Sequence, residues 1–367
     1  MKIIAIIFGT RPEIIKLFPL YLELKKYPKE FIVKLISTGQ HKEMLDQMLK
    51  VFSISPDVSL NIMKNNQTLS GLTSTLIQKL DQVFKKENFD LVIVQGDTTT
   101  TMAASLVAFY HKIKIAHIEA GLRTHDKTQP FPEEINRILT SHISDMHFTP
   151  TQLSKENLAK EGIDPLKIWV TGNTVVDTLL WAKNKVENEI KKYEKIYQKY
   201  LNKDLILVTG HRREHFDKAL SSISEALIEI KEKYSNVNII YPVHLNPNVR
   251  KIILNKLKGI NGIYLIEPLD YFEFIYLMSK SKVILTDSGG IQEEAPSFNV
   301  PVLIFRKSTE RPEAVLEGLS IITGYEKEDI VNKFIDVYEN KRNKILKNPY
   351  GDGRACQYIV QYLRENV

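Results

Sequence analysis

The chain has 367 residues, of which 43% are hydrophobic and 26% are charged, a composition typical of globular proteins. At roughly 150 residues per domain, this length favours two domains over one. The formal net charge is +6, but Lys and Arg alternate with Glu and Asp, which indicates a solvated surface rather than a nucleic-acid groove. No apolar run approaches the roughly 18 residues of a membrane span, which argues against a helical membrane protein.

The cysteine and histidine content limits the cofactors that the chain could hold. Cys356 is the only cysteine, so neither an intramolecular disulfide nor a cysteine-based metal cluster can form. This usage indicates a reducing, cytoplasmic environment. His211, His215 and His244 are too loosely arranged to predict a metal site, so none is expected.

Short apolar runs alternate with amphipathic stretches in the first half of the chain. The runs are continuous and rich in Ile and Val, which is typical of strands buried on both faces of a parallel sheet. The expected strands are Lys2–Phe8, Phe31–Ser37, Leu91–Gln95, Ile113–Ile118, Met146–Phe148 and Lys167–Val170. The helices expected between them include Glu13–Lys26, His41–Phe52, Leu69–Lys86 and Thr98–His111.

The second half repeats this alternation. Its expected strands are Leu205–Val208, Asn238–Pro242, Ile263–Ile266, Val283–Thr286 and Val302–Ile304, with helices such as Ala219–Tyr234 between them. Between the halves, Ala182–Lys203 is predicted to be the end of a long surface helix that leads out of the crossing between domains. The last segment, Arg354–Arg364, has apolar residues at helical spacing and is expected to form a closing helix.

Alternation of strands and helices throughout predicts an α/β fold of two doubly wound, Rossmann-like domains that face each other across a cleft. The N-terminal domain is expected at residues 1–172 and the C-terminal domain at residues 173–350. Residues 351–367 are expected to pack back on the N-terminal domain. Ligands bind beyond the carboxyl ends of strands in such sheets, so the ends of the strands are the places to search for a site.

Polar residues follow several of the expected strands. Arg11 follows the first strand and Gly9, at a helix N-terminus where the backbone N–H groups favour an anion; a solvated arginine in a tight turn is the alternative. Asp97 and Glu119 come at the ends of later strands, and Glu133 follows shortly after a proline. Each carboxylate alone fits a helix cap, but the three together favour acid–base chemistry in one cleft.

The second half carries a histidine and a phosphate-binding pattern at its strand ends. His211 follows Gly210 and precedes two arginines, and could face the carboxylates of the first domain. The turn Ser288-Gly289-Gly290 joins a strand to a helix, where backbone N–H groups favour a diphosphate. Glu294 could then hold ribose hydroxyls. The pattern Gly-x-Gly-x-x-Gly is absent from the chain, which argues against a nicotinamide dinucleotide.

Together these motifs resemble the non-hydrolysing UDP-N-acetylglucosamine 2-epimerases, almost from end to end and in the same order. The motifs that carry the resemblance are Phe8–Glu13, Gly96–Thr100, Glu119–Thr124, Pro132–Glu134, Thr209–Glu214, Pro242–Asn248, Asp287–Pro296, Thr309–Ala314 and Asn348–Gly353. The resemblance implies a glycosyltransferase-B-like pair of domains, usually in a homodimer, with UDP bound mainly by the second domain and no cofactor.

The resemblance also implies roles for particular residues by motif position. The residues implied to hold UDP and its sugar are Arg11, Lys16, Leu269, Phe274, Ser288, Gly289, Gly290, Glu294 and Arg311. The implied catalytic set is Asp97, Glu119, Glu133 and His211. A second, activating nucleotide-sugar site found in many bacterial members would fall at Gln40, His41 and Gln67, although Glu43 and Asn66 stand where a Gln and an Arg are common.

The implied activity is the reversible epimerisation of UDP-N-acetylglucosamine to UDP-N-acetylmannosamine at C2. The hydrogen on C2 is not next to a carbonyl, so its direct removal would be very slow. Departure of UDP from C1 would create an oxocarbenium-like centre that acidifies this hydrogen and would leave a 2-acetamidoglucal, to which UDP adds back. Which carboxylate removes the proton and which returns it stays open.

Two other functions remain as alternatives. A retaining UDP-sugar glycosyltransferase would use the same nucleotide clamp, but it would need an acceptor and would have no use for three convergent carboxylates. A non-catalytic sensor of UDP-sugars would keep the segment from Ser288 to Glu294 without needing Asp97, Glu133 or His211.

Overall fold

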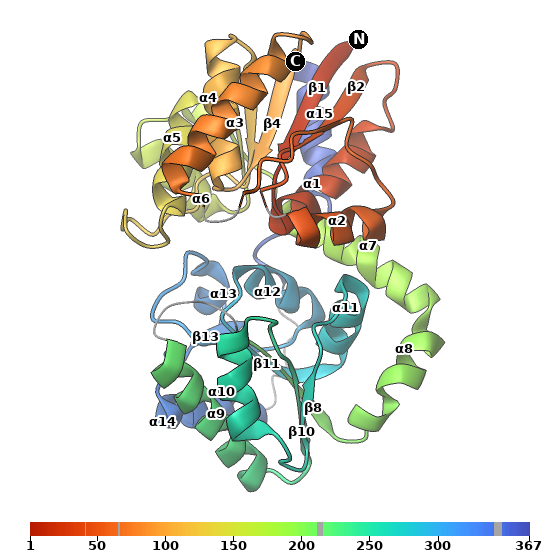
Figure 1. Cartoon of the computed structure of the whole chain (residues 1–367), viewed down its shortest axis with the longest axis vertical. Coiled ribbons are helices and arrows are strands. Elements are labelled where there is room, and N and C mark those ends of the chain that lie inside the picture. Colours follow the sequence, from red (N-terminus) through yellow and green to blue (C-terminus); the bar gives the residue numbers. More distant parts are fainter. Residues whose placement is uncertain (41, 65–66, 211–215, 341–346) are drawn as a thin grey trace. The chain divides into compact units, whose positions relative to one another are not determined.

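The computed structural model describes residues 1–40, 42–64, 67–210, 216–340 and 347–367. The chain divides into two compact units, the first formed by Met1–Thr178 with Tyr350–Val367 and the second by Leu179–Pro349. Each unit is built on one parallel sheet that is covered by helices (Figure 1). This architecture confirms the predicted pair of Rossmann-like α/β domains. The predicted site residues His41 and His211 lie outside the described residues.

The sheet of the first unit has seven strands in the order β3-β2-β1-β4-β5-β6-β7. Their bounds are β1 Lys2–Phe8, β2 Phe31–Ser37, β3 Val58–Ser59, β4 Leu91–Gln95, β5 Lys114–Ile118, β6 Met146–Thr149 and β7 Ile168–Val170. Six of these match expected strands to within one residue. The exception, β3, is only two residues long, so it leaves no apolar run in the sequence.

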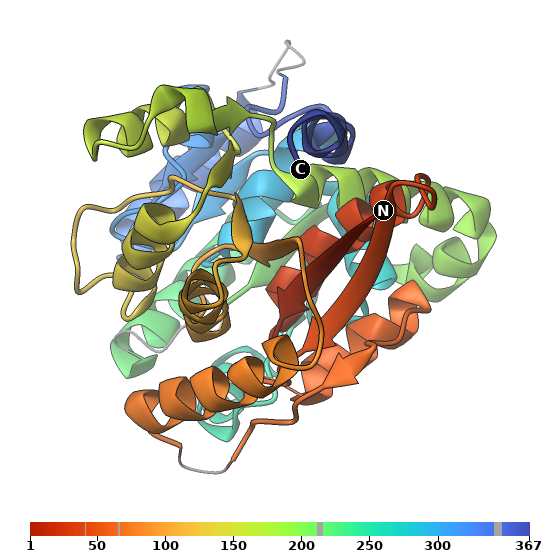
Figure 2. The same ribbon diagram turned by 90° about the horizontal axis from the view of Figure 1, so that it is seen from above.

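Helices cover both faces of this sheet. They are α1 Arg11–Leu24, α2 Lys42–Phe52, α3 Leu69–Phe84, α4 Thr99–Tyr110, α5 Glu133–Ile143, α6 Gln152–Lys160, the 3-10 turn η1 Pro165–Lys167, the start of α7 Thr174–Asn188, and α15 Ala355–Asn366. The helices α3 and α4 share a core with β1 and β4 on one face. Seen from above, the orange α3 and the dark blue α15 lie on opposite sides of the red strand β1 (Figure 2).

The second unit has a six-stranded parallel sheet in the order β10-β9-β8-β11-β12-β13. Its strands are β8 Asp204–Thr209, β9 Val237–Pro242, β10 Ile263–Ile266, β11 Ser281–Thr286, β12 Val302–Ile304 and β13 Ser320–Ile322. Its helices are α8 Ile190–Tyr197, η2 Gln198–Tyr200, α9 Phe216–Lys233, α10 Pro247–Leu257, α11 Tyr271–Lys280, α12 Gly289–Glu294, η3 Ala295–Phe298, α13 Glu313–Leu316 and α14 Lys327–Glu339. Among the strands of this unit in the described residues, only β13 was not expected from the sequence, whereas α9 corresponds to the one helix that was named there, Ala219–Tyr234.

The prediction of one continuous helix through Ala182–Lys203 is wrong. The helix α7 ends at Asn188, α8 starts at Ile190, and a 3-10 turn follows. The break lets Tyr193 and Tyr197 of α8 pack against Tyr276, with ring centroids 5.5 and 5.9 Å apart. Both tyrosines are buried, so the aromatic packing compensates for the interrupted helix.

The C-terminal segment is part of the first unit because its helix is anchored there. Helix α15 packs against α1, and the Asp177 carboxylate accepts hydrogen bonds from the backbone N–H groups of Ala355 and Cys356 at 3.2 and 2.9 Å. A carboxylate at a helix N-terminus is favoured because it satisfies unpaired N–H groups. Cys356 itself is buried.

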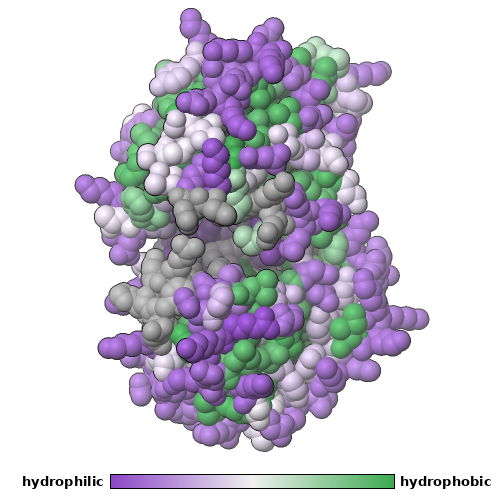
Figure 3. Space-filling model, in the orientation of Figure 1, coloured by the Kyte–Doolittle hydropathy of each residue, from purple (hydrophilic) through white to green (hydrophobic). Residues whose placement is uncertain are grey.

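The surface is mixed in character. On the face drawn in Figure 3, hydrophobic side chains occur in patches between hydrophilic ones. Among the described residues, none of the helices combines the length and the hydropathy that a membrane crossing requires.

Candidate active site

The strand order of the first unit brings its predicted carboxylates to one edge of the sheet. Because β4 lies between β1 and β5, the segments that follow these three strands are neighbours. The backbone N–H of Gly96, just after β4, donates to the carbonyl of Ile118 at 3.0 Å. Asp97 and Glu119 therefore follow adjacent strands at their carboxyl ends, where parallel sheets bind ligands.

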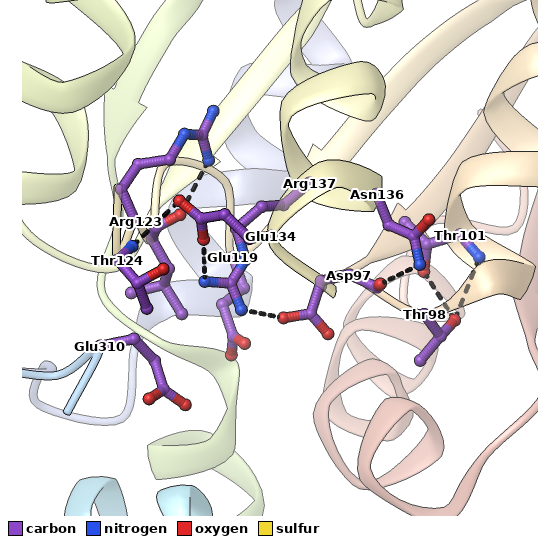
Figure 4. Close-up of polar contacts among 12 residues, drawn as sticks. Asp97, Thr98, Thr101, Glu119, Arg123, Thr124, Glu134, Asn136, Arg137 and Glu310 are labelled. Carbon is purple, nitrogen blue, oxygen red and sulfur yellow. Dashed lines mark hydrogen bonds and ion pairs between the residues drawn. The ribbon is translucent and has the colours of Figure 1, made fainter. Parts of the chain in front are cut away.

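Asp97 is held by an arginine and is not a helix cap. Its carboxylate forms an ion pair with Arg137, and its backbone carbonyl accepts a hydrogen bond from Asn136 at 3.0 Å (Figure 4). The cap of α4 is Thr98, whose hydroxyl accepts from the backbone N–H of Thr101 at 3.1 Å. The capping role that the sequence allowed for Asp97 is therefore wrong, and its side chain is available for another role.

Arg137 connects Asp97 to the loop before α5. Its guanidinium contacts Glu134 at 2.9 Å as well as Asp97, and Arg137 and Glu134 are both buried. Glu134 in turn accepts a hydrogen bond from the backbone N–H group of Thr124 at 3.0 Å (Figure 4) and one from that of His125 at 2.9 Å. Because a buried charge needs a partner, this chain of contacts fixes the loop with respect to Asp97. Glu133, half-buried, is the first residue of α5.

Glu119 is paired with Lys16. Both residues are buried, and the Lys16 ammonium and the Glu119 carboxylate form an ion pair. Asn173 donates a further hydrogen bond from Nδ2 to Glu119 Oε2 at 2.8 Å. The backbone of Glu119 has a φ of +63°, which is uncommon outside glycine and is found at functional sites. Lys16, which the resemblance assigned to the nucleotide, is thus here the cation that compensates Glu119.

Glu13 joins the loop after β1 to the start of α4. Its carboxylate accepts hydrogen bonds from the backbone N–H groups of Gly9 and Thr10 at 2.9 and 2.7 Å, and from the hydroxyls of Thr98 and Thr101 at 2.6 and 3.1 Å. Burial raises the pKa of Glu13, while these hydrogen bonds oppose the shift. Arg11, half-buried at the first position of α1, is positioned by this same turn.

His117 supports the end of β4 from the neighbouring strand. It is fully buried on β5, and its Nε2 lies 2.8 Å from the carbonyl oxygen of Gly96. Because a carbonyl can only accept, Nε2 must carry the hydrogen. Burial lowers the pKa of His117 to about 3, so the ring is neutral. A neutral histidine therefore holds Gly96, the residue before Asp97.

In the second unit, the predicted phosphate-binding turn lies against Arg311. A Cβ on Gly289 would come within 2.6 Å of the Arg311 guanidinium, so a larger residue there would require the Arg311 side chain to move. The Arg311 guanidinium donates to Glu293 at 2.6 Å and also contacts Glu310. Ser288 precedes Gly289 as the N-cap of α12. The Arg311 guanidinium thus lies beside Gly289, the residue that follows Ser288.

The other residues expected to bind the nucleotide lie on the same unit. Glu294 is buried at the end of α12 and accepts a hydrogen bond from the Tyr271 hydroxyl at 3.3 Å. Tyr271 starts α11, which also carries the half-buried Phe274, and Leu269 lies two residues before this helix. Tyr271 thereby joins α11, with Phe274, to Glu294 at the end of α12.

The residues expected at an activating site are only partly described. Gln40 is half-buried and its side-chain oxygen accepts a hydrogen bond from Thr100 at 2.8 Å. Gln67 is half-buried and precedes Thr68, the N-cap of α3. His41 lies outside the described residues, as does His211 of the proposed catalytic set.

Sequence reasoning missed the partners of the carboxylates. Arg137 and Asn173 contact carboxylates that lie 40 and 54 residues away in the chain. Asn173 gave a usable signal, because it is a polar residue soon after strand β7, just as Asp97 and Glu119 follow β4 and β5. In the described parts of the chain, the His, Cys, Asp and Glu side chains form no group of three or more that could hold a metal ion.

Comparison with known proteins supports one family. The family model for UDP-N-acetylglucosamine 2-epimerase matches residues 23–364. The UDP-N-acetylglucosamine 2-epimerase of Escherichia coli K12 is 46% identical over 100% of this chain and 99% of its own. A crystal structure of the Neisseria meningitidis enzyme bound to UDP-GlcNAc has a TM-score of 0.93 with 46% identity, covering 100% of both chains. The Methanocaldococcus jannaschii enzyme in complex with UDP-GlcNAc and UDP has a TM-score of 0.88 with 39% identity, covering 99% and 100%.

We expect His117→Gln to make unfolding less sensitive to acid while keeping a donor for Gly96. An unfolded histidine titrates near pH 6.5, whereas folded His117 has a pKa of about 3. The contribution of neutral His117 to the free energy of unfolding is therefore fully present above about pH 6.5. It is lost as the pH falls towards the folded pKa, because the histidine of the unfolded chain gains a proton that the folded protein does not bind. Urea denaturation between about pH 4.5 and 6.5 should give a slope of unfolding free energy that is shallower by up to about 1.4 kcal/mol per pH unit.

The matched control is His142→Gln, because His142 is exposed on α5. This control should leave the slope close to that of the unsubstituted protein. If His117→Gln and His142→Gln gave the same slope, a neutral, buried His117 would be contradicted.

Proposed function

Because the chain belongs to the UDP-N-acetylglucosamine 2-epimerase family, whose members are isomerases, we propose that it interconverts UDP-N-acetylglucosamine and UDP-N-acetylmannosamine. The observation that carries this proposal is the pair of carboxylates after adjacent strands, each with its own buried cation: Asp97 with Arg137, and Glu119 with Lys16. An enzyme that moves a proton at carbon needs such fixed carboxylates. A nucleotide sensor does not.

The proposed reaction begins with departure of UDP from C1 of the sugar. The C1–O bond breaks and its electron pair leaves with UDP, so that positive charge develops at C1. A carboxylate then removes the C2 proton, and the electrons of the C2–H bond form the C1=C2 double bond of a 2-acetamidoglucal. Return of a proton to the opposite face of C2 and addition of UDP at C1 complete the inversion. The steps balance without an oxidant or a reductant.

We assign the proton transfers to Asp97, Glu119 and Glu133. A general acid or base in position contributes a factor of about 10²–10⁴ to the rate. The ion pairs with Arg137 and Lys16 support this assignment, because they hold the Asp97 and Glu119 carboxylates in fixed positions after adjacent strands. A carboxylate in a fixed position can accept a proton and can stabilise positive charge at C1.

We assign the diphosphate to Arg311 and the Ser288-Gly289-Gly290 turn, and the ribose to Glu294. The closeness of the Arg311 guanidinium to Gly289 supports this assignment, because it puts a cation beside the turn. A preorganised donor that meets developing charge on a leaving group contributes roughly 3–4 kcal/mol. His211 completes the proposed set, although it lies outside the described residues.

A glycosyltransferase would differ in its products. We expect the purified protein to convert UDP-N-acetylglucosamine into UDP-N-acetylmannosamine without an acceptor, and to reach the same mixture from either sugar. Proton NMR of the anomeric signals, in the presence of a chelator, measures both products. Loss of activity with the chelator and recovery with a divalent ion would contradict the proposal that no metal is needed. Dependence on an added acceptor would support a transferase.

The assigned roles predict two classes of variant. Glu133→Gln and Asp97→Asn should lower deuterium uptake at C2 in heavy water by about 10²–10⁴-fold and spare most UDP affinity. Arg311→Ala and Glu294→Ala should instead weaken UDP binding first, because a uniform binding contact mainly affects the Michaelis constant. Calorimetric titration with UDP, at a temperature where each variant is folded, separates the two classes.

Glu133→Gln is the sharper of these tests. As a residue of the first turn of α5 alone, Glu133 would contribute only about 1 kcal/mol of stability. Near-normal deuterium exchange at C2 in this variant would show that Glu133 has only a structural role. Asp97 and Glu119 would then be the acid–base pair.

We further propose that the protein forms a homodimer. Phe109 and Tyr110 at the end of α4, and Ile135 and Leu139 on α5, are large apolar side chains that are exposed. The two helices pack side by side, so neighbouring elements of the first unit both carry exposed apolar side chains. Exposed apolar side chains that gather on one surface are a feature of subunit interfaces.

Light scattering should give a mass of twice 42.3 kDa, and Leu139→Glu should shift it towards the monomer because a charge would be buried in the contact. Leu166→Glu, on the exposed turn η1, is the matched control and should leave the mass unchanged. A monomer in the unsubstituted protein at micromolar concentration would count against the dimer.

A further inference from the structure

Asn173 lies close to the two segments in which the chain passes from one unit to the other. The first unit ends at Thr178 and resumes at Tyr350. The backbone N–H of Asn173 donates to the carbonyl of Tyr350 at 2.6 Å. A Cβ on Gly172 would come within 3.3 Å of Gly351 Cα, and both glycines have positive φ. The two crossing segments are therefore packed backbone against backbone, and we call this contact the junction.

The side chain of Asn173 connects the junction to Glu119. Its Nδ2 donates to Glu119 Oε2 at 2.8 Å, and its Oδ1 accepts from the backbone N–H of Val175 at 3.1 Å. Asn173 is 2% exposed and Glu119 is 8% exposed. One amide thus uses its donor for the carboxylate and its acceptor for the first turn of α7, the helix that carries the chain out of the unit.

The surroundings of Glu119 make this amide important. The charged or titratable groups on the elements around it include Lys16 and Glu13 of α1, Asp97 after β4, Arg123 after β5, Asp177 of α7, and His117 two residues earlier on β5. His117 is neutral because burial lowers its pKa to about 3. Lys16 compensates the charge of Glu119, but an ammonium on a long chain does not fix orientation as a short amide does. The amide of Asn173 is thus the short, uncharged donor that limits the rotation of the Glu119 carboxylate.

We propose that Asn173 is a positioning residue, which orients Glu119 for proton transfer and makes that orientation depend on the junction. The inference rests on the acid–base role of Glu119 proposed above. A misplacement of about 1 Å lowers the rate of an enzyme by roughly 10²-fold. A change at the junction that moves Asn173 therefore changes the rate of proton transfer without touching the residues proposed to bind the nucleotide.

Asn173→Asp tests this inference because it keeps the helix cap and reverses the contact with Glu119. The new carboxylate still accepts from Val175, but it repels Glu119. We expect kcat near pH 8 to fall by roughly 10–100-fold while UDP affinity stays close to that of the unsubstituted protein. Two adjacent carboxylates share a proton readily. As the pH falls, protonated Asp can donate to Glu119 as the amide does, so kcat relative to the unsubstituted enzyme should recover.

Two further variants separate positioning from stability. Asn173→Ala removes the donor and cannot regain it, so its kcat should be low at every pH. Asp177→Asn weakens the anchor of α15 near the junction without contact to Glu119. Its melting temperature should fall, while its kcat and pH profile should match those of the unsubstituted protein.

The inference is overturned if Asn173→Asp has normal kcat at all pH values, or if its loss of kcat is independent of pH. Glu119→Gln distinguishes this failure from failure of the proposed function. If Glu119→Gln is inactive while Asn173→Asp is normal, only the role of Asn173 is wrong. If Glu119→Gln is fully active, the proposed role of Glu119 is wrong as well.

Discussion

The buried ion pair between Lys16 and Glu119 is the interaction on which the site of the first unit depends. Removing one partner of a buried pair costs roughly 3–5 kcal/mol, because the other charge is left uncompensated. The pair therefore ties α1 to the end of β5. Glu13, one turn earlier on α1, ties the same helix to the loop before α4. Placement of Asp97 and Glu119 thus follows from a few buried polar contacts around one helix.

The second unit has the same architecture, a parallel sheet covered by helices, but carries different side chains at the ends of its strands. Its sheet also ends in a turn followed by a helix, but the contacts there put a guanidinium, Arg311, beside the glycine turn at Gly289. In the first unit the buried ion pairs surround Asp97 and Glu119, whereas in the second unit Arg311, paired with Glu293 and Glu310, lies beside the glycine turn to which we assign the diphosphate. This division agrees with a reaction in which a diphosphate leaves from one carbon and a proton moves at the next.

Much of this arrangement could be predicted from the sequence, because strands buried on both faces read as continuous apolar runs. The short strands Val58–Ser59 and Ser320–Ile322 were not predicted, since two or three residues make no apolar run. The break in the helix near Asn188 was not predicted either, because it depends on the tertiary packing of tyrosines. The candidate catalytic carboxylates Asp97 and Glu119 could be identified because each follows the end of a predicted strand. The pairing of these carboxylates with Arg137 and Asn173 could not be predicted, because contacts across 40 and 54 residues leave no local pattern, although the position of Asn173 after β7 marked it as a candidate.

A crystal structure of the complex with UDP-N-acetylglucosamine tests the central claim most directly. The account predicts that the diphosphate contacts Arg311 and the Ser288-Gly289-Gly290 turn. It also predicts that a carboxylate oxygen of Asp97, Glu119 or Glu133 lies within about 3.5 Å of C2, the distance of a near-attack geometry. A complex in which UDP occupies this turn while C2 faces none of the three carboxylates would contradict the account.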